Sequence, residues 1–263
     1  MLEMKAVKIV FHAGTVNEKT ALAGVDLHLA PGEFVTVIGG NGAGKSTLLN
    51  CVSGAYAPTS GEIWIDGQNV THMPEHRRAK LLGRVFQDPM MGTAGNMWIE
   101  ENLALALRRG QKRGLRWGIT QKEREMFKEQ LRRLDLGLED RLSTKVKLLS
   151  GGQRQALTLL MATLQKPKLL LLDEHTAALD PKTARKVLEL SEQIIEEHGL
   201  TSLMVTHNMR DAIRYGHRLI MMHDGRVAVD VSGEEKKKLT VEALLERFSE
   251  SAGSDEVSDR LVL

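Results

Sequence analysis

Two glycine-rich segments could hold an anion with backbone groups. The first, Gly39-Gly40-Asn41-Gly42-Ala43-Gly44-Lys45-Ser46-Thr47, fits the phosphate-binding pattern G-x-x-x-x-G-K-[ST]. Its glycines let backbone N–H groups close around phosphate oxygens, Lys45 brings a charge to the β- and γ-phosphates, and the Ser46 hydroxyl can face Mg²⁺. The second, Leu149-Ser150-Gly151-Gly152-Gln153, opens another predicted helix. Because the chain has one nucleotide-binding core, we expect the second segment to contact a nucleotide on another copy.

Two adjacent carboxylates follow a short apolar run. Residues 168–172 predict a buried strand, and Asp173 and Glu174 come directly after it. Asp173 can orient a metal ion through water, and Glu174 can act as general base on the attacking water, which is typically worth ~10²–10⁴-fold. The alternative is that both acids only cap the junction between strand and loop. A buried strand rarely ends in two adjacent acids without a purpose, which favours the catalytic interpretation.

Two further polar residues follow predicted strands. Gln87 ends a short strand at residues 84–87, and its amide could reach Mg²⁺ or the attacking water. His207 follows a strand at residues 203–205, at the strand end where α/β proteins bind ligands, and could hydrogen-bond the γ-phosphate. Each would more often be structural if it stood alone. The other motifs are what make them candidates.

The apolar pattern predicts how these motifs are positioned. The predicted strands are residues 5–11, 21–29, 34–38, 61–67, 84–87, 168–172, 203–205, 218–223 and 227–231, and the predicted helices are 45–52, 181–198 and 240–248, with others between 98 and 138. This order predicts an α/β fold: a P-loop NTPase core with a parallel sheet, an N-terminal antiparallel β layer, and a helical subdomain at about residues 90–165 that carries the second glycine-rich segment. We expect one domain at residues 1–235 and a short charged helix and tail at 236–263.

Composition narrows the class of protein. The chain has 263 residues, 42% of them hydrophobic, which is enough for one large domain with a buried core. A net charge of +2 is too small to indicate by itself that the chain binds nucleic acid. The single cysteine, Cys51, rules out an internal disulfide and suits a reducing compartment. No segment approaches the ~18 apolar residues of a membrane span, so we expect a soluble cytosolic chain whose membrane partner is another polypeptide.

Two segments leave alternatives open. Residues 108–117 are basic and interrupted by glycine, which favours a solvated loop over contact with lipid headgroups. Residues 88–98 contain three methionines and Trp98, side chains that suit an irregular protein interface. The alternative for Trp98 is that it packs inward on the helical subdomain.

The order of motifs resembles the ATPase subunit of an ABC transporter over about residues 5–230. The motifs are the P-loop, Gln87, Leu-Ser-Gly-Gly-Gln, Leu-Leu-Leu-Leu-Asp-Glu, Ala178-Leu179-Asp180 and His207. The resemblance implies a head-to-tail homodimer with two ATP molecules and Mg²⁺, each ATP lying between one P-loop and the partner's second glycine-rich segment. It makes Gln87 the Q-loop residue, Asp180 part of the D-loop and His207 the switch histidine. Phe11 is similar in position to the aromatic residue that stacks on adenine; the alternative is a core strand residue.

The resemblance also implies a biological role. We expect an ATP-hydrolysing subunit on the cytoplasmic face of a bacterial membrane that energises import through a separate permease, with an extracytoplasmic binding protein and no nucleic acid. Alternatives are an exporter or lipoprotein-release ATPase, a non-transport ABC protein acting on DNA or ribosomes, and a nucleotide switch without turnover. Residues 148–184 resemble a bacterial subgroup of amino-acid-type uptake systems. His175 stands where the family usually has proline and adds a titratable group beside Glu174, so we expect an effect on the turnover rate and its pH dependence.

Overall fold

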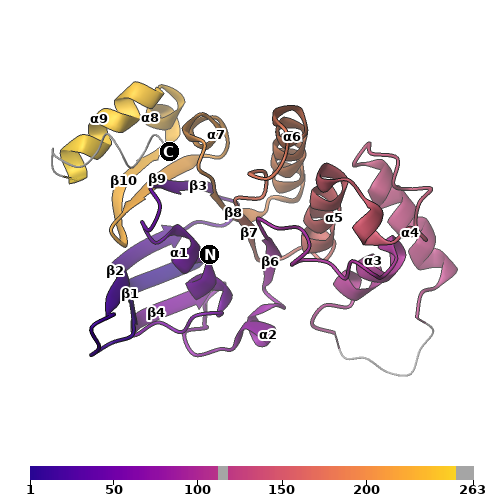
Figure 1. Cartoon of the computed structure of the whole chain (residues 1–263), viewed down its shortest axis with the longest axis horizontal. Helices are drawn as coiled ribbons and strands as arrows, with labels where there is room; N and C mark the ends of the chain where they lie inside the picture. Colours follow the sequence, from indigo (N-terminus) through magenta and orange to yellow (C-terminus); the bar gives the residue numbers. More distant parts are fainter. Residues whose placement is uncertain (112–117, 253–263) are drawn as a thin grey trace.

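A six-stranded sheet assembled from distant parts of the chain forms the centre of the fold (Figure 1). The computed structural model describes residues 1–111 and 118–252. The strand order is β10-β9-β3-β8-β7-β6, in which β10 is antiparallel to β9 and the other neighbours are parallel. Because parallel strands end at the same edge, the loops after β3, β6, β7 and β8 converge there. The strands are β3 (Phe34–Gly39), β6 (Leu82–Val85), β7 (Leu169–Asp173), β8 (Thr201–Val205), β9 (Arg218–His223) and β10 (Arg226–Ser232).

A smaller antiparallel sheet confirms the predicted N-terminal β layer. Its order is β2-β1-β4-β5, with β1 (Leu2–Phe11), β2 (Lys19–Leu29), β4 (Ser60–Ile65) and β5 (Gln68–Asn69). In β1, Leu2 and Met4 are buried, as are Val7 and Ile9 after a shift in the pairing register, so one face of this sheet packs on the core. Between β9 and β10, the Asp224-Gly225 turn has positive φ at both residues, as two-residue hairpin loops of this kind require.

Helix α1 (Lys45–Ser53) lies between the two sheets. Its apolar residues join one buried cluster with side chains from β1, β2, β4 and the larger sheet. The C-terminal end of α1 is closed by Arg78, which belongs to the short helix α2 (Glu75–Arg78) and is 1% exposed. Arg78 Nη1 donates to Cys51 O at 2.8 Å and Val52 O at 2.9 Å, which satisfies carbonyls that the helix leaves unpaired.

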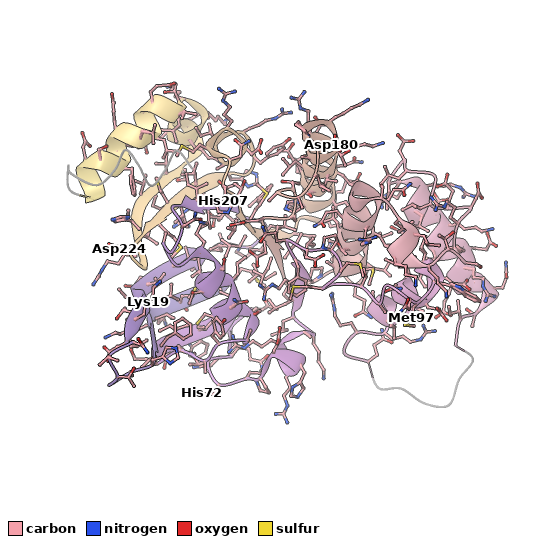
Figure 2. The ribbon with its side chains drawn as sticks, in the orientation of Figure 1. Lys19, His72, Met97, Asp180, His207 and Asp224 are labelled. Atoms are coloured by element: carbon pink, nitrogen blue, oxygen red, sulfur yellow. The ribbon has the colours of Figure 1, made fainter. Side chains whose placement is uncertain are left out.

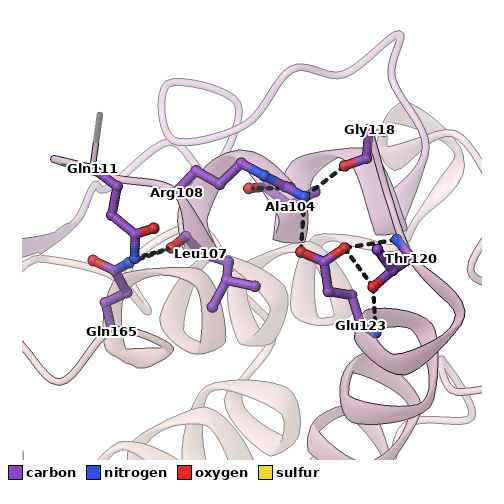
Figure 3. Close-up of polar contacts among 8 residues, drawn as sticks. All are labelled: Ala104, Leu107, Arg108, Gln111, Gly118, Thr120, Glu123 and Gln165. Carbon is purple, nitrogen blue, oxygen red and sulfur yellow. Dashed lines mark hydrogen bonds and ion pairs between the residues drawn. The ribbon is translucent and has the colours of Figure 1, made fainter. Parts of the chain in front are cut away.

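The helical subdomain has a core of its own, to one side of the sheets (Figure 1). Helix α4 begins with a capping box: Thr120 Oγ1 accepts from Glu123 N, and the Glu123 carboxylate accepts from Thr120 N (Figure 3). Phe127 and Leu131 of α4 are fully buried in this core. The elements are α3 (Ile99–Leu107), α4 (Gln121–Arg132), the 3₁₀ turn η1 (Val146–Leu148) and α5 (Gly151–Thr163).

The first two arginines of the basic run make hydrogen bonds within the protein, so the expectation of a solvated loop is wrong for Arg108 and Arg109. Arg108 donates to Glu123 Oε1 at 2.7 Å and to Gly118 O at 2.6 Å (Figure 3). Arg109 donates to Ala162 O and Gln165 O, and burial lowers its pKa. Residues 112–117, which hold the rest of the run, lie outside the described residues.

The remaining helices cover the larger sheet. Helix α6 (Pro181–His198) buries one face with Val187, Leu188 and Ile195, and α7 (Met209–Arg214) packs beside β3. The C-terminal part forms α8 (Gly233–Lys237) and α9 (Val241–Ala252), where the sequence predicted one helix at 240–248. Among residues 1–111 and 118–252, no helix combines the length and apolarity needed to cross a bilayer.

Candidate functional site

The P-loop connects β3 to α1, where the sequence predicts it. Gly39 and Gly44 have φ values of 149° and 102°, which side chains rarely allow. A Cβ atom on Gly39 would lie 2.4 Å from Met222 O, and one on Gly44 would lie 2.7 Å from Ala21 O. Only glycine therefore fits at these two positions, and the loop is held close to the core.

The start of α1 is prepared for an anion. Gly44 occupies the N-cap, no side chain of the described residues caps the helix, and its first turn has no acidic residue. The first N–H groups of α1 are thus left for another acceptor, and the positive end of the helix dipole favours an anion there. Lys45 is 5% exposed, and its Nζ donates to Gly39 O at 2.8 Å and Gly40 O at 3.2 Å. These features fit a nucleotide phosphate.

Burial and neighbouring acids act in opposite directions on Lys45. Desolvation lowers the pKa of its ammonium, whereas Glu174 and Asp173 raise it. The two carboxylates therefore lie close enough to Lys45 to interact electrostatically with its ammonium group. The strand end and the P-loop form one electrostatic site, as the sequence predicts.

Asp173 ends β7 and is held by a residue that sequence reasoning missed. Arg84 Nη2 donates to Asp173 Oδ2 at 2.8 Å, with side-chain exposures of 13% and 14%. Arg84 lies in β6, which pairs with β7 in the sheet. Its signal in the sequence is a charged residue in a strand otherwise composed of Leu82, Gly83 and Val85, because a charge in such a place needs a partner.

Glu174 and His207 meet above the carboxyl ends of β7 and β8. His207 Nε2 lies 2.6 Å from Glu174 Oε2. The glutamate side chain is 9% exposed and that of His207 is 49% exposed, so the pair joins a shielded carboxylate to an open imidazole. Figure 2 shows His207 near the middle of the molecule, by the larger sheet. Glu174 also has a φ of 44°, a strained conformation for a side-chain-bearing residue that turns the chain sharply after β7.

His175 points away from the nucleotide site. It is 2% exposed, and its Nε2 lies 3.0 Å from Ser191 Oγ on α6. Ser191 Oγ donates its proton to Val187 O at 2.8 Å, so Nε2–H of His175 is the donor to Ser191. Burial lowers the pKa of His175 to about 4. The imidazole is therefore neutral at ordinary pH, and it joins the turn after β7 to helix α6.

The second glycine-rich segment opens α5, as the sequence predicts, and also caps that helix. Ser150 and Gln153 form the capping box, with Ser150 Oγ accepting from Gln153 N at 3.2 Å. Ser150 and Gly151 are exposed, whereas Gly152 is buried against α6. A Cβ on Gly152 would lie 2.2 Å from Thr183 Cγ2, so this glycine lets the two helices approach each other.

Three other predicted residues lie around these motifs. Asp180 is exposed at the start of α6 (Figure 2), where it accepts from Thr183 N at 3.1 Å, and hydrogen bonds from Thr183 lower its pKa. Gln87 is exposed and follows β6, which begins and ends two residues earlier than the sequence predicts. Phe11 is half-buried, with its ring edge-to-face on Tyr56 at 5.3 Å between centroids. Whether these residues contact a nucleotide stays a prediction.

The oxygen donors of the site suit Mg²⁺ better than a transition metal. The sequence assigns the ion to Ser46, Gln87 and Asp173, which offer hydroxyl, amide and carboxylate oxygens. The described residues contain no cluster of three His, Cys, Asp or Glu side chains able to hold a metal alone.

Comparison with known proteins gives a consistent result. Residues 22–177 match the family model described as ABC transporter. The chain is 46% identical over 248 residues to a tyrosine transport ATP-binding protein of Clostridioides difficile, covering 94% of this chain and 98% of that protein. It is 38% identical over 207 residues to the thiamine import ATP-binding protein ThiQ of Photorhabdus laumondii, covering 78% and 82%. A solved dimeric ATP-binding cassette in a post-hydrolysis state, bound to ADP and Pi, matches with a TM-score of 0.76 and 33% identity, covering 88% and 98%.

Proposed function

The chain belongs to the ABC transporter family, and we propose that it powers the uptake of an aromatic amino acid, tyrosine first among them. It is an ATPase subunit of the importer type, which hydrolyses ATP and energises uptake through a separate permease. The clostridial relative supports the choice of cargo because the match spans nearly the whole length of both proteins. Cargo is selected by other chains, so the proposal concerns the system in which this subunit works.

The observation that best supports the proposed mechanism of hydrolysis is the contact of Glu174 with His207. A carboxylate held at 2.6 Å from an imidazole, beside the P-loop lysine, is placed to accept a proton from water. In the proposed mechanism Glu174 is the general base. His207 orients that carboxylate and donates to the γ-phosphate, while Lys45 and the α1 N–H groups bind the phosphates.

The metal site and the adenine contact complete the proposed ATP site. Ser46 and Gln87 would bind Mg²⁺ directly and Asp173 through water. An ion held there would neutralise charge on the β- and γ-phosphates. Phe11 is proposed to stack on adenine, for which its half-exposed ring beside Tyr56 is suited.

A second copy of this chain is proposed to complete each site. Ser150 and Gly151 are exposed at the start of α5, and that helix end favours an anion. The cap by Ser150 Oγ occupies the N–H group of Gln153, and the other N–H groups of the first turn are left for a phosphate. In a head-to-tail homodimer the segment would contact the ATP of the partner subunit, with Asp180 nearby. The dimeric solved relative supports this arrangement.

The permease is proposed to bind an apolar surface that we call the docking face: Met90, Met91, Trp98 and Leu148. Met91 and Leu148 are 70% and 66% exposed, and Trp98 is 43% exposed, so the inward alternative for Trp98 is wrong. Backbone hydrogen bonds from residues 146 and 147 to Met97 O and Gly95 O bring the two segments of this face together. Met90 and Met91 of the docking face follow Gln87 closely in the sequence. This proximity would couple binding of the permease to the presence of nucleotide at Gln87. The subunit would then lie on the cytoplasmic side of the membrane, with an extracytoplasmic binding protein delivering the cargo.

The test of the docking face uses a matched pair of variants. Met91→Asp should reduce recovery of the subunit with its permease from detergent-solubilised membranes, because a charge replaces an apolar contact. Val16→Asp is the control, since Val16 is equally apolar and fully exposed at 102%, but lies in the loop between β1 and β2. Both variants should keep their fold and ATP binding. Equal recovery of the two variants would refute the proposal that the permease binds the docking face.

The test of hydrolysis and cargo uses the complex recovered with the permease. Glu174→Gln should bind ATP but hydrolyse it at least ~10²-fold more slowly, and light scattering should show ATP-dependent dimers. Near-normal turnover would refute the base assignment. Proteoliposomes of the wild-type complex, with the binding protein, should accumulate labelled tyrosine when ATP is supplied. ATP hydrolysis without uptake of tyrosine, phenylalanine or tryptophan would refute the cargo but not the ATPase.

A further inference from the structure

The side chain of Arg84 joins three elements that build the nucleotide site. Its Nη2 donates to Asp173 Oδ2 at 2.8 Å, and its Nη1 donates to Ser53 Oγ at 3.2 Å, at the last residue of α1. Its guanidinium carbon lies 4.6 Å from the centroid of the Phe86 ring. One planar group therefore contacts the strand that leads to Gln87, the strand that ends in Asp173, and the helix that begins at the P-loop.

The register of the sheet places Arg84 and Asp173 on the same side. Arg84 pairs with Leu171 across β6 and β7, and side chains of paired residues share a face. Asp173 is two residues beyond Leu171 and so returns to that face. Leu171 packs in the cluster that contains α1, whereas Leu172 packs in the cluster on the other face. The contact with Asp173 thus follows from strand pairing.

Stability is a weak reason for keeping this pair. Both side chains are mostly buried, and Arg84 Nε is buried with no hydrogen-bond partner among the described residues. Removing two charges from water largely offsets their attraction, and apolar residues of similar volume often stabilise a fold as well or better. What the guanidinium offers that an apolar side chain cannot is a fixed direction for the Asp173 carboxylate.

We propose that Arg84 is a positioning residue that orients the Asp173 carboxylate, and thereby sets how strongly Mg²⁺ promotes nucleotide binding. This inference rests on the proposed role of Asp173 at the metal. Arg84 holds Oδ2, while Oδ1 accepts no hydrogen bond from the described residues and remains for a metal-bound water. The rigid fork of an arginine, anchored by Ser53, holds the carboxylate in place before the ion arrives.

The test measures binding rather than turnover. Titration calorimetry gives the Kd of the non-hydrolysable ATP analogue AMP-PNP in EDTA and in Mg²⁺, and their ratio is the magnesium effect. Arg84→Gln should reduce this ratio about tenfold, as loss of a residue that orients a metal ligand commonly does. The Kd in EDTA should change less than about twofold, because the phosphates are held by the P-loop.

Two further variants separate positioning from packing. Arg84→Lys keeps a cation but loses the fork, so its magnesium effect should lie between those of the wild type and Arg84→Gln. Ser53→Ala removes the anchor on α1, together with a hydrogen bond from Ser53 Oγ to Asn50 O within that helix, and should give a smaller loss in the same direction. Arg108→Gln is the control, because it breaks a 2.7 Å pair with Glu123 that is also partly buried but lies in the helical subdomain. It should leave the magnesium effect unchanged.

Each outcome decides between the possibilities. An unchanged magnesium effect in Arg84→Gln, or equal weakening of binding in EDTA and in Mg²⁺, overturns the positioning role. If Arg84→Gln does not fold, the same criteria apply to Arg84→Lys and Ser53→Ala. A wild-type protein whose nucleotide affinity is indifferent to Mg²⁺ would instead overturn the proposed metal site, so failure of that proposal is distinguishable from failure of this one.

Discussion

The buried His175 should make the fold sensitive to mild acid. Burial lowers the pKa of His175 to about 4, whereas in the unfolded chain it returns to its ordinary 6.5. Between these values the unfolded chain binds more protons than the folded one, so stability rises with pH. The contribution of the neutral, buried His175 to the free energy of unfolding is fully present above pH 6.5 and is lost as the pH falls towards 4.

The size of the effect follows from the two pKa values. The full shift corresponds to about 3 kcal/mol, and the part lost between pH 7.5 and pH 5.0 is about 2 kcal/mol. That is a large fraction of the ~5–15 kcal/mol by which folded proteins exceed unfolded ones. The imidazole is wholly buried against α6, so little solvent screening reduces the figure.

Urea unfolding at the two pH values measures this contribution. The free energy of unfolding is determined for the wild type and for His175→Asn, without nucleotide or Mg²⁺, so that only the empty fold is compared. The wild type should lose about 2 kcal/mol more than His175→Asn between pH 7.5 and pH 5.0. His72→Asn removes an exposed imidazole (Figure 2) and should behave like the wild type. Equal losses in the wild type and His175→Asn would refute the buried, neutral imidazole.

Three further outcomes follow from the site and its packing. Lys45→Ala should weaken ATP binding in calorimetry, whereas Ser150→Arg should leave ATP binding to the monomer intact but abolish hydrolysis. Mixing the two inactive proteins should restore part of the phosphate release. Loss of ATP binding to the Ser150→Arg monomer would contradict a site shared between subunits. Gly152→Ala should cost about 1–3 kcal/mol in urea unfolding because its methyl group would clash with Thr183, and adding Thr183→Ser, which removes Cγ2, should recover much of that loss. Cys51 is fully buried and burial raises its thiol pKa to about 11, so a thiol reagent should label it only at the rate of global unfolding; rapid labelling of the native protein would be inconsistent with this core.

Local patterns were enough to predict the motifs and most of the elements. The P-loop, the strand before Asp173, the helix at 181–198 and both hairpin strands after residue 217 have signals carried by neighbouring residues. The strand near Gln87 was placed two residues late because its end is set by pairing with β7, not by its own four residues. The short helix α8 gave no periodic signal, since five residues are too few to show one.

The contacts that refine the site could not be predicted from local patterns. Arg84 reaches Asp173 across 89 residues of chain, and the contact depends on which strands become neighbours. His175 was expected to influence Glu174 directly, whereas its side chain faces Ser191 instead. The sequence shows that His175 follows Glu174, but adjacent residues after a sharp turn point in different directions. Residue types and order therefore predicted the chemistry, and the tertiary fold determined which residues support it.

The central position of β3 has a consequence for how the chain folds during synthesis. The P-loop strand lies between β8 and β9, and just before it Gly32 N donates to Thr201 Oγ1, 169 residues further along the chain. A ribosome adding 5–20 residues per second needs roughly 10 to 30 seconds to make that intervening length. Throughout this interval both edges of β3 lack their partners, and the P-loop has its contacts with β2 but lacks the contact of Gly39 with Met222 in β9. The nascent N-terminal half must therefore be kept from aggregating, and a chain that ends before β9 cannot complete an ATP site.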